Sequence, residues 1–184
     1  MWKSVMQMIQ SMDEERYVFL RNTENISDDF SEEDDLDILC YDIKKIVECV
    51  HAIPLNNRDR CYNYYTVINN RKLFLDIRCV GDGYFDRMWE IEMIDTRKRK
   101  GLLYVLNDEN QKYSVLYHCL FQKDNLSAKK YSNYIEKVFG SYDINQNIIQ
   151  LSEFMKEKKY CFEMPDDKGV YLNNENIKSL KEIL

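Results

Sequence analysis

Glycine and proline are scarce in this chain, whose 184 residues include 5 glycines and 2 prolines. This scarcity excludes a collagen-like repeat and a glycine- or proline-rich low-complexity chain. No apolar run approaches the roughly 20 residues that a membrane-spanning helix needs, so the sequence predicts no membrane span. The N-terminal stretch also lacks the uninterrupted apolar core of a signal peptide, and we therefore expect a cytoplasmic protein.

Positive charge is in deficit, because the formal net charge is −6. A protein that grips duplex nucleic acid needs a broad basic face, so we expect no duplex nucleic acid partner. The densest basic block is the stretch RKRK at residues 97–100. We interpret it as a solvated loop, with steering of an anionic substrate as the alternative.

The cysteines form no metal-binding pattern: there is no CxxC pair and no cluster of cysteine and histidine at zinc spacing. We therefore expect buried, reduced thiols rather than a zinc site. The six dispersed cysteines are Cys40, Cys49, Cys61, Cys79, Cys119 and Cys161.

The hydrophobic patterning predicts an α/β fold (mixed α+β) in which a mixed sheet is flanked by helices. We expect a core over residues 1–106 and a mainly helical C-terminal portion over 107–184, packed on the core. The predicted strands are 17–20, 35–41, a hairpin over 61–80 that turns at Asn69 and Asn70, a short strand after the basic loop, and a small hairpin over 159–173. The predicted helices are 2–14, 42–52, one after the turn at residues 81–83, several after 109, and a final one beginning near Asn174.

Three carboxylates lie on predicted strands. Because strand side chains alternate between faces, Asp35 and Asp37 share one face while Leu36 and Ile38 point the other way. Residues two apart on a strand are about 7 Å apart, so both carboxylates can bind one ion or a pair of ions. Asp76, on the second strand of the hairpin, is the candidate third ligand.

Such oxygen ligands suit Mg²⁺ or Mn²⁺, whose remaining coordination positions take water and substrate phosphate. This is the chemistry of metal-dependent phosphoryl and nucleotidyl transfer. The alternative is that Asp35 and Asp37 merely begin an edge strand, after an acidic loop exposed to solvent. We adopt the loop interpretation for Glu32, Glu33 and Asp34 only.

The spacing of these segments resembles the nucleotidyltransferase-fold superfamily, which includes DNA polymerase β. The stretch FLRN is followed after twelve residues by DLDI and later by LDI. The resemblance covers residues 15 to 106 and implies that Asp35, Asp37 and Asp76 bind the metal, with Asp76 also activating an acceptor hydroxyl. Arg21 and Asn22 stand where the family has Gly followed by Gly or Ser.

A narrower resemblance extends almost to the C-terminus. The stretches DLDIL, LDIRCVGDGYFDRMWE and YSVLYHCLFQKDNLS resemble bacterial nucleotidyltransferase-like proteins of surface-polysaccharide gene clusters. This resemblance implies a nucleotide or nucleotide-linked donor and a sugar or polyol acceptor.

Several other side chains are candidates for substrate binding. A guanidinium at Arg21 can bind phosphate through two hydrogen bonds, or form a structural ion pair instead. Lys72 and Arg78 share the face of Asp76 and are candidate phosphate contacts or countercharges. The predicted set of substrate-binding residues is Arg21, Asn22, Lys72, Arg78 and Asp82. His118, within a predicted helix, is interpreted as a structural histidine.

We therefore expect a Mg²⁺-dependent nucleotidyltransferase-like enzyme that acts on a phosphate-containing donor. Two alternatives stay open: a phosphotransferase that uses a nucleotide-linked phosphoalcohol, and a non-catalytic binding or regulatory module of the same fold. The sequence indicates neither the identities of donor and acceptor nor an oligomeric state.

Overall fold

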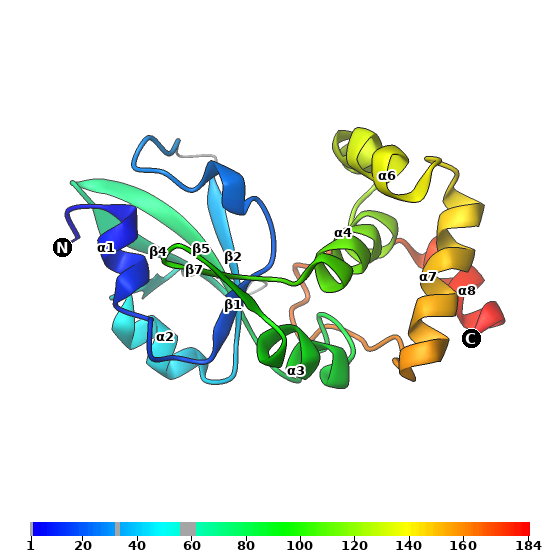
Figure 1. The fold of residues 1–184 in the computed structure, drawn as a ribbon, viewed down its shortest axis with the longest axis horizontal. Helices are drawn as coiled ribbons and strands as arrows, with labels where there is room; N and C mark the ends of the chain where they lie inside the picture. The colour runs from blue at the N-terminus through cyan, green and yellow to red at the C-terminus, as the bar shows by residue number, and fades with distance from the viewer. Residues whose placement is uncertain (1, 32–33, 56–61) are drawn as a thin grey trace.

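The computed structural model describes residues 2–31, 34–55 and 62–184, and it confirms the predicted mixed α/β fold (Figure 1). The strands are β1 (Tyr17–Phe19), β2 (Asp35–Cys40), β3 (Ile53–Pro54), β4 (Asn63–Ile68), β5 (Arg71–Cys79), β6 (Lys98–Lys100) and β7 (Leu103–Val105). The helices are α1 (Val5–Gln10), α2 (Ile43–Cys49), α3 (Arg87–Asp95), α4 (Asp108–Phe121), α5 (Asn125–Ala128), α6 (Ser132–Phe139), α7 (Ile144–Lys158) and α8 (Asn174–Ile183), with the short 3₁₀ turns η1 (Thr23–Asn25) and η2 (Lys129–Tyr131).

Within the described residues the strands form one seven-stranded sheet in the order β3-β4-β5-β2-β1-β7-β6. At its centre β2 runs parallel to β5 and antiparallel to β1. The hairpin β4–β5 turns at Asn69 and Asn70, which both have positive φ, as predicted. These central strands carry all three acidic residues singled out from the sequence.

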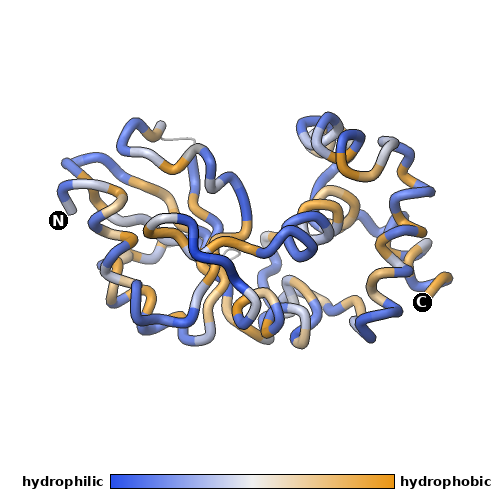
Figure 2. The backbone as a smooth tube through the Cα atoms, in the orientation of Figure 1, coloured by the Kyte–Doolittle hydropathy of each residue, from blue (hydrophilic) through white to orange (hydrophobic). Residues whose placement is uncertain are grey.

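The sheet has an apolar core on each face. One core lies beneath α1 and α2 and includes Leu36, Ile38 and Ile77. The other includes Leu39 from β2 together with side chains of α3, α4 and α7. The predicted alternation of β2 is thus confirmed. Figure 2 shows hydrophobic segments gathered where the central strands cross, while many outer turns are hydrophilic.

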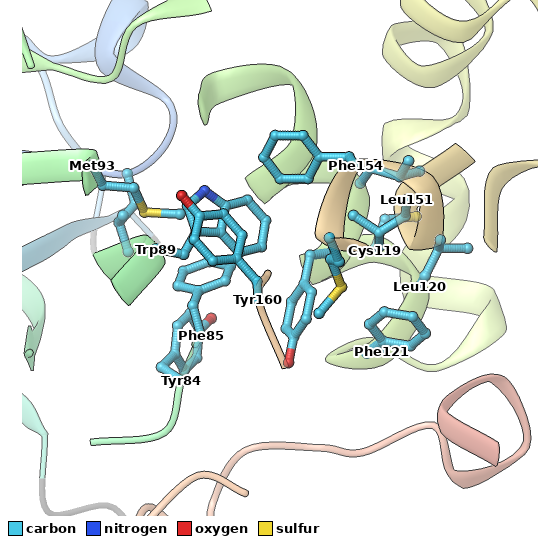
Figure 3. Close-up of a cluster of buried hydrophobic side chains, with 14 of the residues drawn as sticks. Tyr84, Phe85, Trp89, Met93, Cys119, Leu120, Phe121, Leu151, Phe154 and Tyr160 are labelled. Carbon is cyan, nitrogen blue, oxygen red and sulfur yellow. The ribbon is translucent and has the colours of Figure 1, made fainter. Parts of the chain in front are cut away.

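Aromatic side chains join the sheet to the C-terminal helices (Figure 3). Trp89 of α3 is fully buried and stacks on Tyr160 with ring centroids 5.4 Å apart. Its indole Nε1 donates a hydrogen bond to Asn110 Oδ1 of α4 at 2.9 Å. Phe154 of α7 packs edge-on against the same indole. Burial of such large rings contributes several kcal/mol and fixes α3, α4 and α7 against one another.

The predicted hairpin over residues 159–173 is wrong, because this described segment contains no strand. It runs instead as an extended strap from α7 back to the sheet and then to α8 (Figure 1). The amide of Asp166 donates to the carbonyl of Asp82 at 2.8 Å, and the amide of Asn173 donates to the carbonyl of Phe121 at 2.9 Å. The strap therefore satisfies its backbone at turns and helix ends rather than in a ladder.

The basic block is also different from the prediction, since residues 98–100 form the edge strand β6 rather than a loop. All three side chains are exposed, and Arg99 forms an ion pair with Asp13 at 2.9 Å. An edge strand needs no apolar face when its side chains point to solvent, and charged side chains protect it from pairing with other chains.

Three smaller predictions also have outcomes. The N-terminal helix is shorter than 2–14, because α1 spans only Val5–Gln10. Among the described residues the cysteines are free, as expected, but only Cys40 and Cys119 are buried, while Cys49 and Cys79 are half-buried and Cys161 is exposed. Cys61, Glu32 and Glu33 lie outside the described residues. No helix in the described ranges has the length and apolar character to cross a bilayer.

Candidate functional site

The three acidic residues meet on one wall of a polar cavity. Parallel pairing of β2 with β5 sets Asp37 directly beside Asp76, and Asp35 lies two residues earlier on the same face of β2. All three line a cavity of about 300 Å³ between the sheet and the C-terminal segments. The alternation of each strand together with this register therefore brings the predicted metal ligands together.

Arg21 is bound to one of these carboxylates. Its Nε donates to Asp37 Oδ2 at 3.1 Å, and its Nη2 donates to the other oxygen of the same carboxylate. Both side chains are 7% exposed, so the pair is almost completely buried. Arg21 lies two residues after the end of β1, the antiparallel neighbour of β2. Between them, the amide of Leu20 donates to the carbonyl of Asp37 at 2.9 Å. The antiparallel neighbour thus delivers the guanidinium to this carboxylate.

Arg78 neutralises a second carboxylate from within the same strand. Its Nη2 donates to Asp76 Oδ2 at 3.0 Å. Its Nη1 lies 3.0 Å from Asp167 Oδ2 in the strap, which makes Arg78 a bridge between the sheet and the strap. Asp35, in contrast, forms no ion pair within the part of the chain that the structure describes.

Crowding of the carboxylates changes their proton affinity. Burial raises the pKa of Asp76 to about 6, and the charge of Asp37 contributes in the same direction while Arg78 opposes it. Burial also raises the pKa of Asp35, again with a contribution from Asp37. The pKa values of these carboxylates are raised even though two arginines lie nearby. The site therefore favours additional positive charge.

The donor atoms suit a divalent cation, although the arginines already hold two of the carboxylates. Within residues 2–31, 34–55 and 62–184 no three His, Cys, Asp or Glu side chains form a ready group for a metal ion. Asp76 Oδ1 is nevertheless buried without a hydrogen bond, although it forms an ion pair with Arg78 Nε at 2.8 Å. This oxygen and the unpaired Asp35 carboxylate are hard ligands of the kind that Mg²⁺ and Mn²⁺ prefer.

A hydrogen-bonded network supports the floor of the cavity. The Tyr84 hydroxyl accepts from Arg21 Nη2 at 3.3 Å and lies 3.1 Å from His118 Nδ1. The Gln122 amide donates to the Tyr84 carbonyl at 2.7 Å, which leaves its oxygen to accept from His118 Nδ1 at 3.0 Å. Burial lowers the pKa of His118 well below its usual value, so the ring is neutral and orients Tyr84.

Two predicted substrate-binding residues lie away from the cavity. Lys72 is exposed near the start of β5, with its ammonium 4.7 Å from the ring centroid of Tyr65. Asp82 is buried, and its carboxylate accepts from the amides of Cys79 and Tyr84 at 3.2 and 2.9 Å. The Asp82 side chain therefore stabilises its own turn. Of the predicted set, Arg21, Asn22 and Arg78 line the cavity.

The contact between the Asp82 turn and the strap requires glycine at residue 83. Gly83 has φ of +74°, and a Cβ built there would lie 2.2 Å from the carbonyl oxygen of Met164 in the strap. The strap can therefore reach the cavity only because residue 83 has no side chain. Beyond this contact the strap supplies Asp167 and Tyr171 to the cavity wall.

Sequence reasoning missed four charged residues that line the cavity, namely Lys123, Asp124, Lys130 and Asp167. Lys123 and Lys130 flank α5, opposite the sheet. The segment that contains Lys123 belongs to the stretch YSVLYHCLFQKDNLS, which carried the narrower resemblance, and this was the available signal. Comparisons with protein-family models, with curated proteins and with solved structures gave no significant match.

Proposed function

We propose that this protein is a Mg²⁺- or Mn²⁺-dependent nucleotidyltransferase-like transferase. It would act in the cytoplasm on a nucleotide or nucleotide-linked donor, with a sugar or polyol as acceptor. The observation that carries the proposal is the lateral pairing of Asp37 with Asp76, with Asp35 on the same cavity wall. Two acidic residues on one strand and a third on a neighbouring strand is also the arrangement that the family resemblance implies.

The three carboxylates would share the metal ion, and Asp76 would have a second role as the base. Asp35, Asp37 and Asp76 would hold the divalent ion, which when bound neutralises charge on the donor phosphates. Asp76 Oδ1 is free of hydrogen bonds and is the atom that would accept the proton of the acceptor hydroxyl. Without a bound ion, burial raises the pKa of Asp76 to about 6. An ion held by the same carboxylate would oppose this shift and keep Asp76 ionised, as a general base must be.

The two arginines of the site would contribute to donor binding. Arg21 and Arg78 are paired with Asp37 and Asp76. If a divalent ion took the place of a guanidinium at its carboxylate, that guanidinium would be placed to bind a donor phosphate. A phosphotransferase acting on a nucleotide-linked phosphoalcohol would use the same residues. The arginine pairs also favour another candidate, a non-catalytic binding module, because they already neutralise two carboxylates without metal.

Turnover with a matched pair of variants tests the proposal. Purified protein with Mg²⁺ is screened against nucleotides and nucleotide-sugars by thermal shift, since a ligand specific for the folded state stabilises it. Release of pyrophosphate or nucleotide is then measured for each hit. Asp35→Asn should abolish turnover without unfolding the protein, because Asp35 has no ion-pair partner in the described structure.

Asp29→Asn is the matched control, because Asp29 is exposed in the acidic loop that precedes β2 and does not line the cavity. This variant should keep full activity. Equal activity of wild type and Asp35→Asn on a confirmed substrate would contradict the proposed metal chemistry.

A further inference from the structure

Two lysines face the acidic wall across the cavity. Lys123 follows the end of α4 and is half-buried, and Lys130 lies in η2 with an exposed side chain. Both line the same cavity as Asp35 and Asp37. The cavity therefore has three carboxylates with Arg21 and Arg78 on its sheet side, and two ammonium groups with Asp124 on its helical side.

The lysines are not neutralised by the protein. Neither forms an ion pair within the described residues. Burial lowers the pKa of Lys123, and repulsion from Lys130 and Arg21 lowers it further, while attraction by Asp37 and Asp35 opposes these effects. Lys123 is thus a half-buried cation without an ion-pair partner among the described residues.

Two of the carboxylates near Lys123, those of Asp37 and Asp124, are occupied elsewhere. Asp37 is bound by Arg21 through two hydrogen bonds. Asp124, next to Lys123 in the chain, caps α5 by accepting from the amides of Leu126 and Ser127 at 3.0 Å each. The Ser127 hydroxyl donates to its other oxygen at 2.6 Å. Asp35 attracts Lys123 but forms no ion pair with either lysine in the described structure, so an anion that joins Lys123 to Lys130 would have to come from outside the chain.

We propose that Lys123 and Lys130 form a subsite for the diphosphate group of the donor. This inference rests on the proposed function and assigns its phosphate contacts to residues outside the family resemblance over 15–106. A diphosphate carries charge on several oxygens, so it can contact both lysines and still present an oxygen to the acidic wall. A single carboxylate carries one charge and would satisfy one lysine only.

The cavity also explains why the contact would be to diphosphate rather than to a base or sugar alone. Its described lining is dominated by charged and hydrogen-bonding side chains, and includes three tyrosines, Tyr84, Tyr131 and Tyr171. Nucleoside triphosphates and nucleotide-linked sugars share the diphosphate, and the subsite would therefore serve either donor class.

Calorimetric titration with inorganic pyrophosphate in metal-free buffer tests the subsite. Wild type should bind, and Lys123→Gln should weaken binding about 10- to 100-fold, the effect of losing a hydrogen bond to a charged group. Lys130→Gln should weaken it in the same direction. Lys129→Gln is the matched control, because Lys129 neighbours Lys130 in η2 but does not line this cavity, and its affinity should equal that of wild type.

A nucleoside diphosphate and a nucleotide-sugar, titrated in parallel, distinguish the two donor classes. The subsite would be overturned if wild type did not bind pyrophosphate, or if wild type and Lys123→Gln bound it with equal affinity. Asp35→Asn separates this outcome from failure of the catalytic proposal, because it should retain metal-free pyrophosphate binding. If the lysine variants alone lose pyrophosphate binding but the protein turns over no donor, the subsite is supported and only the proposed function is contradicted.

Discussion

The protonation of Asp76 should make the stability of the metal-free protein fall as the pH rises from about 4 to 7. Folding raises the pKa of Asp76 from 3.8 to about 6. Between these values the folded state binds more protons than the unfolded state, so the free energy of unfolding decreases with increasing pH and levels off above pH 6. A difference of about 2 pKa units corresponds to about 3 kcal/mol.

Urea denaturation of wild type and Asp76→Asn across this pH range measures the effect. Asparagine keeps the size of the side chain and its oxygen can still accept from Arg78, but it cannot titrate. Other buried carboxyls contribute to both curves, and Glu90, whose pKa burial raises to about 8, is the largest of them. The relevant quantity is therefore the difference between the two curves, and parallel curves would refute the argument from burial and crowding.

Magnesium should reverse this loss in wild type only. A bound cation keeps Asp76 ionised, and Mg²⁺ at 100 times its dissociation constant should add about 2.7 kcal/mol to the free energy of unfolding at pH 7. Asp76→Asn should gain much less under the same conditions.

Two further variants test the Arg21–Asp37 ion pair and the contact between Gly83 and the strap. Arg21→Met should destabilise the metal-free protein by about 3 to 5 kcal/mol, because it leaves the buried Asp37 unpaired, and Mn²⁺ should restore part of this loss in urea denaturation; absence of any rescue would contradict the exchange of arginine for metal. Gly83→Ala should cost about 3 kcal/mol or more, since its Cβ would meet the Met164 carbonyl. Gly101→Ala, also at positive φ but with open space around it, should cost about 1 to 2 kcal/mol by thermal or urea unfolding, and equal costs would mean that the strap contact is dispensable.

The sequence was sufficient to predict the faces of the central strands. Leu36 and Ile38 alternate with Asp35 and Asp37, and the period of two leaves no other arrangement for a half-buried strand. The Asn69-Asn70 turn likewise predicted the hairpin, because asparagine tolerates the left-handed conformation that both residues adopt. Local patterns were enough wherever the structure depends on neighbours in the chain.

Patterns could not predict contacts that depend on strand order. Arg21 meets Asp37 only because the first strand lies antiparallel beside β2, and nothing near Arg21 in the chain specifies that neighbour. The 159–173 segment has the tyrosine, phenylalanine and valine of a strand, yet its amides bond to Asp82 and Asp86 instead of a partner strand. Lys123 and Lys130 reach the site through the packing of helices on the second sheet face, which lies beyond the superfamily resemblance over residues 15–106; only the narrower resemblance extended as far as Lys123.

The most direct measurement of the central claim is anomalous diffraction from crystals soaked in Mn²⁺. The account predicts a single strong peak, or a close pair of peaks, at the acidic wall, with oxygens of Asp35, Asp37 and Asp76 within about 2.0 to 2.6 Å of the ion. Arg21 should then have left Asp37. A fully soaked crystal with no manganese at this wall, and with the Arg21–Asp37 pair intact, would contradict the claim that these three carboxylates form a metal site.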